Sequence, residues 1–466
     1  MTERVSLGKF GDVRREERGA WLLERTVACG SLTIRTIGET RAGEMAVHRF
    51  LDSPEVTPAE ILSTLGARTA AACAGRRIVA VQDTTEINFR GRDRGRRDLG
   101  RGGDNVGLGF FLHPLIAVDI ESEAVLGLLG AEIWSRPVEQ DGSACKQRRR
   151  RSLTQKESRR WLQGATAAAQ LRETAPQVIV IGDRESDIYA VFARCPAGTD
   201  LLVRAAQNRA VAEGGLLFDA PAAWPVVTRY DLAVPSRGPG DAGRTARIAV
   251  RAGTVRLKRP LHGAEAGDPD KVALTLVEAR EEDTPANAPP IHWRLLTTLA
   301  AKDARQACEV VRLYRLRWRI EQTFRALKTD GLGLPDVQVR DAERLFKLAA
   351  IGLAAAVRTI QLVDARAGGP RPASDVADGD LIAAAAAIGP TLEGKTAKQT
   401  NPHPPGSLAW LSWIVARLGG WTGYYKPPGP KVMRRGWDRL AAMAEGFLLA
   451  KRSQASPVWQ IIPELV

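Results

Sequence analysis

Hydrophobic residues follow two patterns along this chain: continuous β-branched runs that predict strands, and helically spaced positions that predict amphipathic helices. Val- and Ile-rich runs predict strands at 76–83, 111–120, 124–134, 177–182 and 200–206. The first three indicate an antiparallel meander, and a predicted helix over 154–173 separates them from the fourth. Because strands and helices both contribute to this stretch, we expect an α/β core.

The two ends of the chain are predicted to be mainly helical. Residues 1 to about 72 are mixed in charge and include an amphipathic stretch at 12–28 and a helix that opens at Thr57 and Pro58. Further helices with apolar or aromatic faces are predicted at 342–367, 408–421 and 435–452. The first of these is expected to pack in the core.

Composition changes along the chain predict three regions. A helical region covers 1–72, a core covers 73–365, and a linker with a helical C-terminal region covers 366–466. Within the core, short apolar runs alternate with Gly, Pro and charge over about 207–290, which predicts an inserted β subdomain. The linker is expected over 366–408, where Pro and Gly are frequent.

The overall composition favours a cytoplasmic protein that binds a polyanion. Lys and Arg number 67 against 53 acidic residues, and a net charge of +14 favours a partner that is a polyanion. Basic residues gather at 90–103 and 146–151, where loops that reach phosphates are expected. Five dispersed cysteines indicate a reducing cytosol and no zinc knuckle. Without a signal-like h-region or an apolar run of about 18 residues, we expect a cytoplasmic protein outside the membrane.

One predicted helix carries a polar stripe. Tyr314, Arg317, Glu321 and Lys328 are spaced by three, four and seven residues, which places them on one face at about 100° per residue. A carboxylate between an arginine and a lysine suits metal-dependent phosphoryl transfer, since Glu321 can hold a hard cation while the basic groups hold phosphates. A solvated face with an i,i+4 ion pair is the alternative reading.

Two aspartates follow predicted strands. Asp83 comes late in the run 76–83, and Asp183 follows the run 177–182, where a helix can begin. Ligand sites in open α/β sheets lie at the carboxyl ends of strands, so both side chains are placed to join Glu321 in a carboxylate triad. Each aspartate alone is also a common turn or cap residue.

In the order Asp83, Asp183 and Glu321, with the signature Tyr314, Arg317, Glu321 and Lys328, the chain resembles the DDE transposases of the insertion-sequence-four family. The segments 10–18, 48–56, 182–189 and 435–451 extend the resemblance to nearly the whole chain. It implies a ribonuclease-H-like mixed sheet with flanking helices and a β insertion before the glutamate helix. It also implies a bacterial, nucleoid-associated enzyme that moves DNA by cut-and-paste transposition.

The resemblance implies partners and roles as well. Two Mg²⁺ ions, for which Mn²⁺ is expected to substitute, would be held by the carboxylate triad. The DNA partners would be the terminal inverted repeats, recognised by residues 1–72, and the target, with a homodimer formed in the synaptic complex through the C-terminal helices. Trp293 matches the position where relatives stack a flipped base during hairpin formation, and Arg204 matches a DNA-contacting arginine. Tyr314, Arg317 and Lys328 would hold phosphates beside the scissile bond. A core tryptophan is the alternative for Trp293.

Two other functions are weighed against transposition. One is a catalytically silent DNA-binding or inhibitory relative of the same fold. The other is a P-loop ATPase, because the segment 389–396, "GPTLEGKT", satisfies the phosphate-loop pattern. That motif requires a strand before it and a helix after it, whereas here an alanine-rich helical run precedes it and prolines follow it. We therefore expect no nucleotide site.

Overall fold

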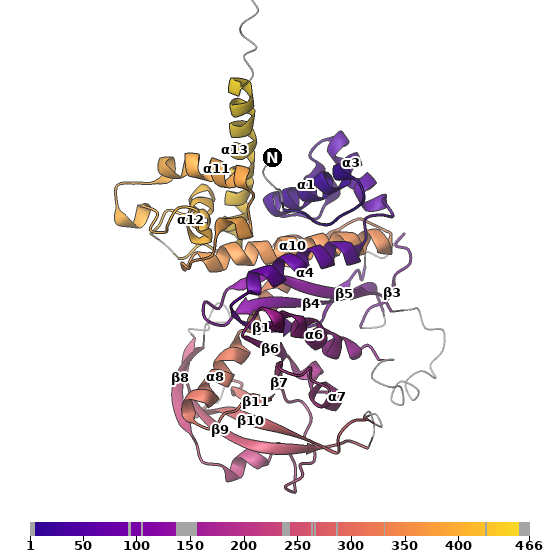
Figure 1. Ribbon diagram of the computed structural model, residues 1–466, viewed down its shortest axis with the longest axis vertical. Coiled ribbons are helices and arrows are strands. Elements are labelled where there is room, and N and C mark those ends of the chain that lie inside the picture. The colour runs from indigo at the N-terminus through magenta and orange to yellow at the C-terminus, as the bar shows by residue number, and fades with distance from the viewer. Residues whose placement is uncertain are drawn as a thin grey trace, which may run out of the picture.

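The computed structural model describes residues 5–91, 95–103, 106–136, 156–234, 243–261, 264, 267–285, 288–329, 331–424 and 426–455, the side chains only to 451 in the last helix (Figure 1). Its strands are β1 (Arg77–Gln82), β2 (Thr85–Asn88), β3 (Gly100–Arg101), β4 (Leu108–Asp119), β5 (Val125–Trp134), β6 (Gln177–Gly182), β7 (Asp200–Arg204), β8 (Thr228–Val234), β9 (Arg244–Lys258), β10 (Lys271–Glu282) and β11 (His292–Thr297). Its α-helices are α1 (Val13–Cys29), α2 (Ile34–Gly38), α3 (Arg41–Asp52), α4 (Pro58–Cys73), α6 (Arg159–Ala169), α7 (Tyr189–Ala193), α8 (Ala304–Arg315), α9 (Trp318–Lys328), α10 (Ala342–Ala365), α11 (Gly379–Ile388), α12 (Leu408–Leu418) and α13 (Pro430–Ala455).

One mixed sheet of 11 strands forms the centre of the protein, in the order β2-β4-β1-β6-β7-β11-β10-β9-β8 with β3 and β5 both paired to β4. Only the pairs β1–β6 and β6–β7 are parallel, and the other pairs are antiparallel. The predicted meander is confirmed, since β4 pairs antiparallel with both β1 and β5.

The central strands are apolar along most of their length because both faces of the sheet are covered. On one face of β1, Val79 and Val81 join the core cluster that contains α10, while on the other Ile78 and Ala80 join the cluster that contains Trp161 of α6. A strand buried on both sides cannot alternate apolar with polar residues. This explains the continuous Val and Ile runs, and it confirms the predicted α/β architecture.

The strands predicted as an insertion extend this sheet. Three long strands, β8, β9 and β10, form antiparallel pairs, and β11 joins them to β7 over the register Leu295↔Arg204 to Thr297↔Leu202. The lower part of Figure 1 is therefore continuous with the central strands. β8 ends the sheet, and its alternation of exposed and half-buried positions is that of an edge strand.

Helix α10 lies between the sheet and the terminal helices (Figure 1). It contacts β5 and α4 on the sheet side, α1 near the N-terminus, and α12 and α13 near the C-terminus. Among the described helices it alone has the length and hydropathy to cross a membrane, and 89% of its apolar window is buried inside the protein. The long apolar stretch is thus accounted for by packing on several sides.

Several predicted boundaries differ from the structure. The helix expected over 154–173 begins at Arg159 and continues into a 3-10 turn that ends at Glu173. Residues 154 and 155 of the expected range lie outside the described residues. The expected linker over 366–408 contains α11, because its alanine run favours a helix. The single helix expected to carry the polar stripe is two helices, α8 and α9, joined at Leu316 and Arg317 by i→i+3 hydrogen bonds.

Candidate active site

Asp83 and Asp183 come together because their strands are parallel neighbours. β1 and β6 pair with Val81 opposite Ile181, so their carboxyl ends meet at one edge of the sheet and each aspartate directly follows its strand. The Asp83 carboxylate accepts from the Thr84 backbone N–H at 2.8 Å. The Asp183 carboxylate caps the 3-10 turn Arg184–Ser186 by accepting from the Glu185 N–H at 2.8 Å.

Glu321 reaches this edge from the first turn of α9, and Arg317 connects it to Asp83. The Arg317 guanidinium donates from Nη1 to Oδ2 of Asp83 at 3.0 Å and from Nη2 to Oε1 of Glu321 at 2.6 Å. The Arg317 and Asp83 side chains are only 12% and 13% exposed. Two residues that are 234 positions apart are thus held together in a largely desolvated ion pair.

Burial and the neighbouring charges raise the pKa of Asp83 well above the usual value for an aspartate. Burial, together with the negative charges of Asp183 and Glu321, raises the pKa of Asp83 to about 7 despite the opposing effect of Arg317. One guanidinium therefore does not offset the cost of bringing three carboxyl groups together. This region can accept additional positive charge.

The chemistry of these donors fits a hard divalent cation. Oxygen ligands from Asp83, Asp183 and Glu321 are of the kind that Mg²⁺ prefers. Oε2 of Glu321 is buried and has no hydrogen-bond partner among the described residues. Within the described ranges, no three His, Cys, Asp or Glu side chains converge as a complete set of metal ligands. Arg317 bridges two of the carboxylates here, so a cation would have to replace at least part of that pairing.

Four predicted DNA-contacting residues form a second cluster beside the carboxylates: Trp293, Tyr314, Arg317 and Arg204. The Trp293 and Tyr314 rings meet edge to face with centroids 6.0 Å apart, and Arg317 lies over the Tyr314 ring at 5.9 Å. Burial raises the pKa of the Tyr314 hydroxyl, while the charges of Arg317 and Arg204 oppose that rise. Arg204 also donates to the backbone carbonyl of His292 at 3.2 Å. Tyr314 therefore remains a neutral hydroxyl between two guanidinium groups.

Lys328, the last residue of the polar stripe, lies apart from this cluster. Burial lowers its pKa, and the nearby charge that opposes the shift is Glu86 of β2, not a member of the carboxylate group. It follows Glu321 by seven residues, two helical turns, which carries it along α9 toward β2. The structure thus places Tyr314, Arg317 and Glu321 with the aspartates and Lys328 at the neighbouring strand.

Sequence reasoning missed a hydrogen-bonded chain beneath Asp83. Gln82 donates from Nε2 to the Trp161 carbonyl at 3.1 Å, and its Oε1 lies 3.2 Å from Nε2 of His113. Since Oε1 can only accept, Nε2 of His113 carries the proton and Nδ1 accepts from the Thr84 hydroxyl at 2.9 Å. Burial lowers the pKa of His113 to about 3, so the ring is neutral. Only the fold unites these distant residues, so no sequence motif signalled the chain.

Two further residues near the site were also missed. Glu185 stands two residues after Asp183 and lines a cavity of about 480 Å³ with Thr84 and Glu86. Burial and the Asp183 charge raise the pKa of Glu185. Trp318 directly follows Arg317 and is 59% exposed. The sequence signal for both was their nearness to a predicted site residue, and the exposed indole is a natural stacking surface.

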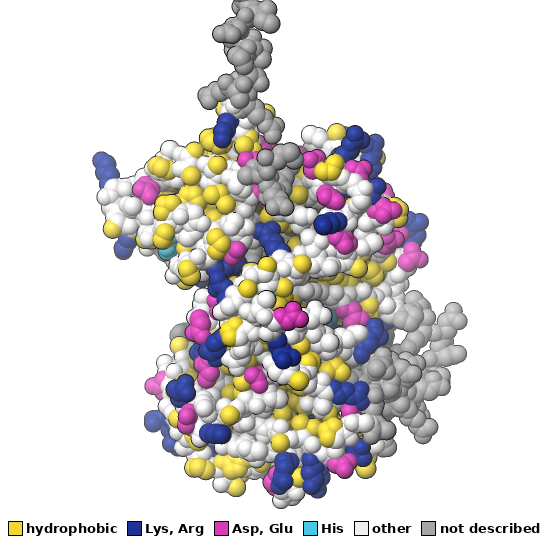
Figure 2. Space-filling model, viewed as in Figure 1, with side chains coloured by type: hydrophobic (Ala, Val, Ile, Leu, Met, Phe, Trp, Pro, Cys, Tyr) yellow, Lys and Arg dark blue, Asp and Glu magenta, His cyan; other side chains and the backbone are white. Residues whose placement is uncertain are grey.

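One arginine of the basic segment 90–103 contacts the protein itself, and the expected phosphate contacts of this segment stay a prediction. Arg96, within 90–103, lies 3.5 Å from the centre of the Phe89 ring and donates to the Val337 carbonyl at 2.7 Å, so it supports the fold. The segment 146–151 lies outside the described residues. Figure 2 shows basic and acidic side chains interspersed over the visible face.

The segment 389–396 has no nucleotide-binding architecture. It begins as a 3-10 turn, Gly389–Leu392, directly after α11, and a second short turn, Ala397–Gln399, follows it. The preceding strand and the following α-helix that a phosphate loop requires are replaced by these elements. The predicted rejection of an ATP site at this segment agrees with the local fold.

A family comparison agrees with the arrangement of the sheet. Residues 113–358, just over half of the chain, match the model of the transposase DDE domain. The matched range contains Asp183 and Glu321, while Asp83 precedes it. The mixed sheet with flanking helices is consistent with the ribonuclease-H-like fold of these enzymes. Members act on DNA in transposition and generally use divalent metal ions. The chain belongs to the transposase DDE domain family.

Proposed function

We propose that the protein is a cut-and-paste transposase of the insertion-sequence-four type, with Asp83, Asp183 and Glu321 as its catalytic carboxylates. The observation that carries the proposal is the convergence of carboxylates at one sheet edge, where Arg317 bridges Asp83 and Glu321. Burial and the charges of Asp183 and Glu321 raise the pKa of Asp83 there. Structural ion pairs satisfy each other's charge, whereas this group retains an excess of negative charge and a buried, unpartnered carboxylate oxygen.

The three carboxylates would hold two Mg²⁺ ions, with Mn²⁺ as a substitute. Bound there, the ions would supply activation of an attacking water or 3′-hydroxyl and stabilisation of the leaving oxygen. Asp83 and Asp183 would approach from the strand ends and Glu321 from α9. The carboxylates must be ionised for this role, so cleavage should fall as the pH drops below the pKa of the metal-bound group.

Arg317 has two proposed roles. In the described arrangement it neutralises Asp83 and Glu321, which keeps the carboxylates together without a metal. When cations take over that neutralisation, the guanidinium would become available to a DNA phosphate, for which its planar fork is suited.

The neighbouring residues would position DNA. Tyr314, Arg204 and Lys328 would contact phosphates, and Trp293 would stack a flipped base during hairpin formation at the transposon end. Trp293 is half-buried and meets the Tyr314 ring, whereas Trp318 is mostly exposed, so Trp318 is the more accessible stacking surface. We assign Trp318 to DNA contact on that basis.

The remaining regions complete the proposal. Residues 1–72 would recognise the terminal inverted repeats, residues 73–365 would form the catalytic core, and the helices of 366–466 would pair two copies in a synaptic complex. Met443 and Leu449 of α13 are 47% and 63% exposed, which leaves apolar surface on that helix for a second copy. Cleavage, hairpin formation and strand transfer would then occur in a DNA-bound homodimer in the bacterial cytoplasm, on the nucleoid.

The test is incubation of the full chain with DNA duplexes that carry the native element ends, with and without Mg²⁺, scored for nicks, hairpins and joined products. The variants Asp83→Asn and Glu321→Gln should lose cleavage by at least about 10³-fold and still bind DNA. Asp231→Asn, an exposed aspartate of β8, is the matched control and should cleave normally.

Three outcomes separate the possibilities. Mg²⁺-dependent nicking by Asp83→Asn would refute the assignment of the carboxylates. DNA binding by the unmodified protein without cleavage under any divalent metal would instead identify a catalytically silent relative. Nicks and joined products without hairpins would retain the transposase and remove the hairpin step.

A further inference from the structure

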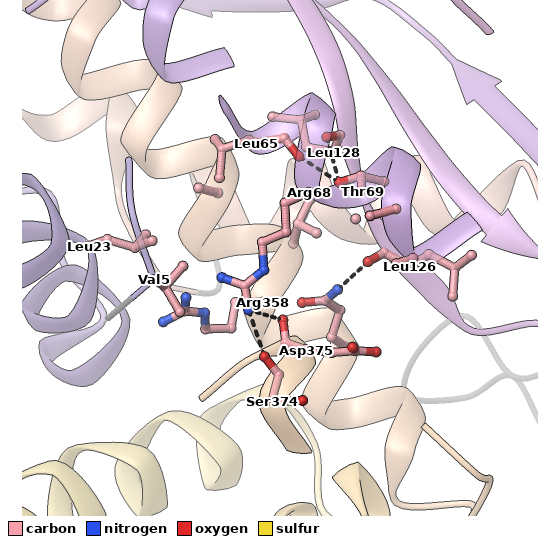
Figure 3. Close-up of a pocket in the computed structure, with 16 residues that line it drawn as sticks. Val5, Leu23, Leu65, Arg68, Thr69, Leu126, Leu128, Arg358, Ser374 and Asp375 are labelled. Carbon is pink, nitrogen blue, oxygen red and sulfur yellow. Dashed lines mark hydrogen bonds between the residues drawn. The ribbon is translucent and has the colours of Figure 1, made fainter. Parts of the chain in front are cut away.

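A second cavity lies away from the carboxylates, where the N-terminal helices, the sheet and the C-terminal region meet. Its volume is about 330 Å³, and none of its lining residues belongs to the candidate active site. Leu23 of α1, Leu65 of α4, Leu126 of β5 and Val357 of α10 give it apolar walls. Figure 3 shows the side chains of Arg68 and Arg358 coming close together in this space.

Arg358 already has one ion-pair partner. Its guanidinium pairs with the Glu24 carboxylate and lies over the Trp437 ring, 5.8 Å from the ring centre. With a side chain only 6% exposed, Arg358 is held in place by these two contacts. It therefore forms a fixed wall of the cavity and offers positive potential to whatever lies beside it.

Arg68 has no carboxylate partner within 4.0 Å in the described part of the chain. Its Nη2 donates to the backbone carbonyls of Ser374 and Asp375, both at 2.8 Å. The side chain of Asp375, which also lines the cavity, accepts from Arg371 at 2.9 Å instead. The two carbonyls orient the Arg68 guanidinium but leave its full charge without a counter-ion.

This arrangement lowers the pKa of the Arg68 guanidinium. Burial and, to a smaller degree, the charge of Arg358 lower its pKa to about 10, although Asp375 and Glu24 partly oppose the decrease. A guanidinium ordinarily stays protonated well above that range. Of the two arginines that line the cavity, Arg358 has an ion-pair partner and Arg68 has none among the described residues.

We propose that this cavity binds a small organic anion, with the Arg68 guanidinium as its main ligand and Arg358 as the second. A guanidinium fork binds a phosphate or a carboxylate through paired hydrogen bonds, so either headgroup fits. Because a bare phosphate would leave the leucine and valine walls in contact with water, the ligand should also carry a compact apolar part.

The location of the cavity means that a bound ligand would contact all three regions of the chain. Its walls come from α1, α4, β5, α10 and the short turn Ala373–Asp375, which belong to all three regions of the chain. An occupant would tie these elements together and stabilise the folded protein in proportion to its occupancy.

The test measures thermal unfolding and calorimetric binding of the full chain without DNA, at constant ionic strength. The probes are phenyl phosphate, benzoate and inorganic phosphate, with phenol as the uncharged control. Phenyl phosphate or benzoate should stabilise the protein saturably, and phenol should not. The better of the two identifies the headgroup that the site prefers.

Variants assign the effect to the cavity. Arg68→Gln should weaken binding at least tenfold, and Arg68→Lys, which keeps the charge but loses the fork, should fall between it and the unmodified protein. Arg14→Gln, at an exposed arginine of α1, is the matched control and should bind normally. Circular dichroism shows whether each variant folds. If Arg68→Gln does not fold, the comparison between Arg68→Lys and the unmodified protein tests the proposal.

Two results would overturn the proposal: no saturable response to either organic anion, or unchanged affinity in folded Arg68→Gln or Arg68→Lys protein. Because the measurement uses no DNA and no metal, its outcome is independent of whether the carboxylates catalyse transposition.

Discussion

His113 provides the sharpest quantitative prediction, because its burial links folding stability to acid. The ring lies edge-on to Trp161 with centroids 4.6 Å apart, donates to Gln82 and accepts from Thr84. Its pKa falls from 6.5 to about 3 in the folded protein. Below pH 6.5 the unfolded chain binds a proton at this residue that the folded protein does not, so stability falls with decreasing pH.

The size of the effect follows from this difference in pKa. Each pH unit below 6.5 costs about 1.4 kcal/mol until the folded-state value is reached, so the loss between pH 7.5 and pH 5.0 is about 2 kcal/mol. The variant His113→Gln cannot be protonated and should lack this contribution. It should be less stable than the unmodified protein at pH 7.5, since it disturbs two buried hydrogen bonds, by about 1–3 kcal/mol.

The assay is urea unfolding at both pH values, followed by tryptophan fluorescence. The stability gap between the unmodified protein and His113→Gln should narrow by about 2 kcal/mol on going to pH 5.0. His403→Gln is the matched control: its pKa is lowered by a smaller degree of burial, so its gap should change less. A His113 gap that is the same at both pH values would refute the assignment of a buried, neutral imidazole.

Three further predictions concern individual contacts. Arg317→Lys, which cannot span two carboxylates as the guanidinium does, should reduce cleavage by about 10²-fold or more in the element-end assay, and unchanged cleavage would contradict its bridging role. Lys347→Met removes a buried ammonium that donates to the Leu51 and Ser53 carbonyls at 3.0 Å, so thermal unfolding should show a loss of about 2–3 kcal/mol; a change below about 0.5 kcal/mol would speak against this role. Gly164→Ala would place a Cβ 2.1 Å from Oε1 of Gln82 and should cost about 1–3 kcal/mol in urea unfolding, whereas a neutral effect would mean that the Gln82 side chain moves freely.

Much of the central fold could be predicted because its strands are buried on both faces. The Val and Ile runs around Ile78 and Ile179 have few alternatives to a covered sheet, and Asp83 and Asp183 follow from the carboxyl ends of those strands. That placement needed only local sequence and the general geometry of α/β sheets. The metal and DNA roles of these residues remain predictions.

Other parts depended on contacts that local sequence does not encode. The turn at Leu316 and Arg317 keeps helical dihedral angles, so residue spacing alone does not reveal that α8 and α9 are separate helices. Lys328 lies by Glu86 because β2 pairs at that side of β4, and the strands after 207 join the sheet through β11, two facts of topology. The His113 chain likewise unites β1, β4 and α6 only after folding.

The packing of α10 limits how this enzyme can be recombined. Gly352 in its middle allows Leu32 and Leu327 to approach so closely that an added Cβ would lie within 3 Å of both. Its other sides are shaped to β5, α1 and α13. A terminal helical region taken from a relative would therefore have a packing surface that is complementary to that relative's α10 and not to this one. In a chimera, a transplanted terminal region should be moved together with the α10 against which it packs. The segment to exchange is therefore larger than any of the three regions predicted from the sequence.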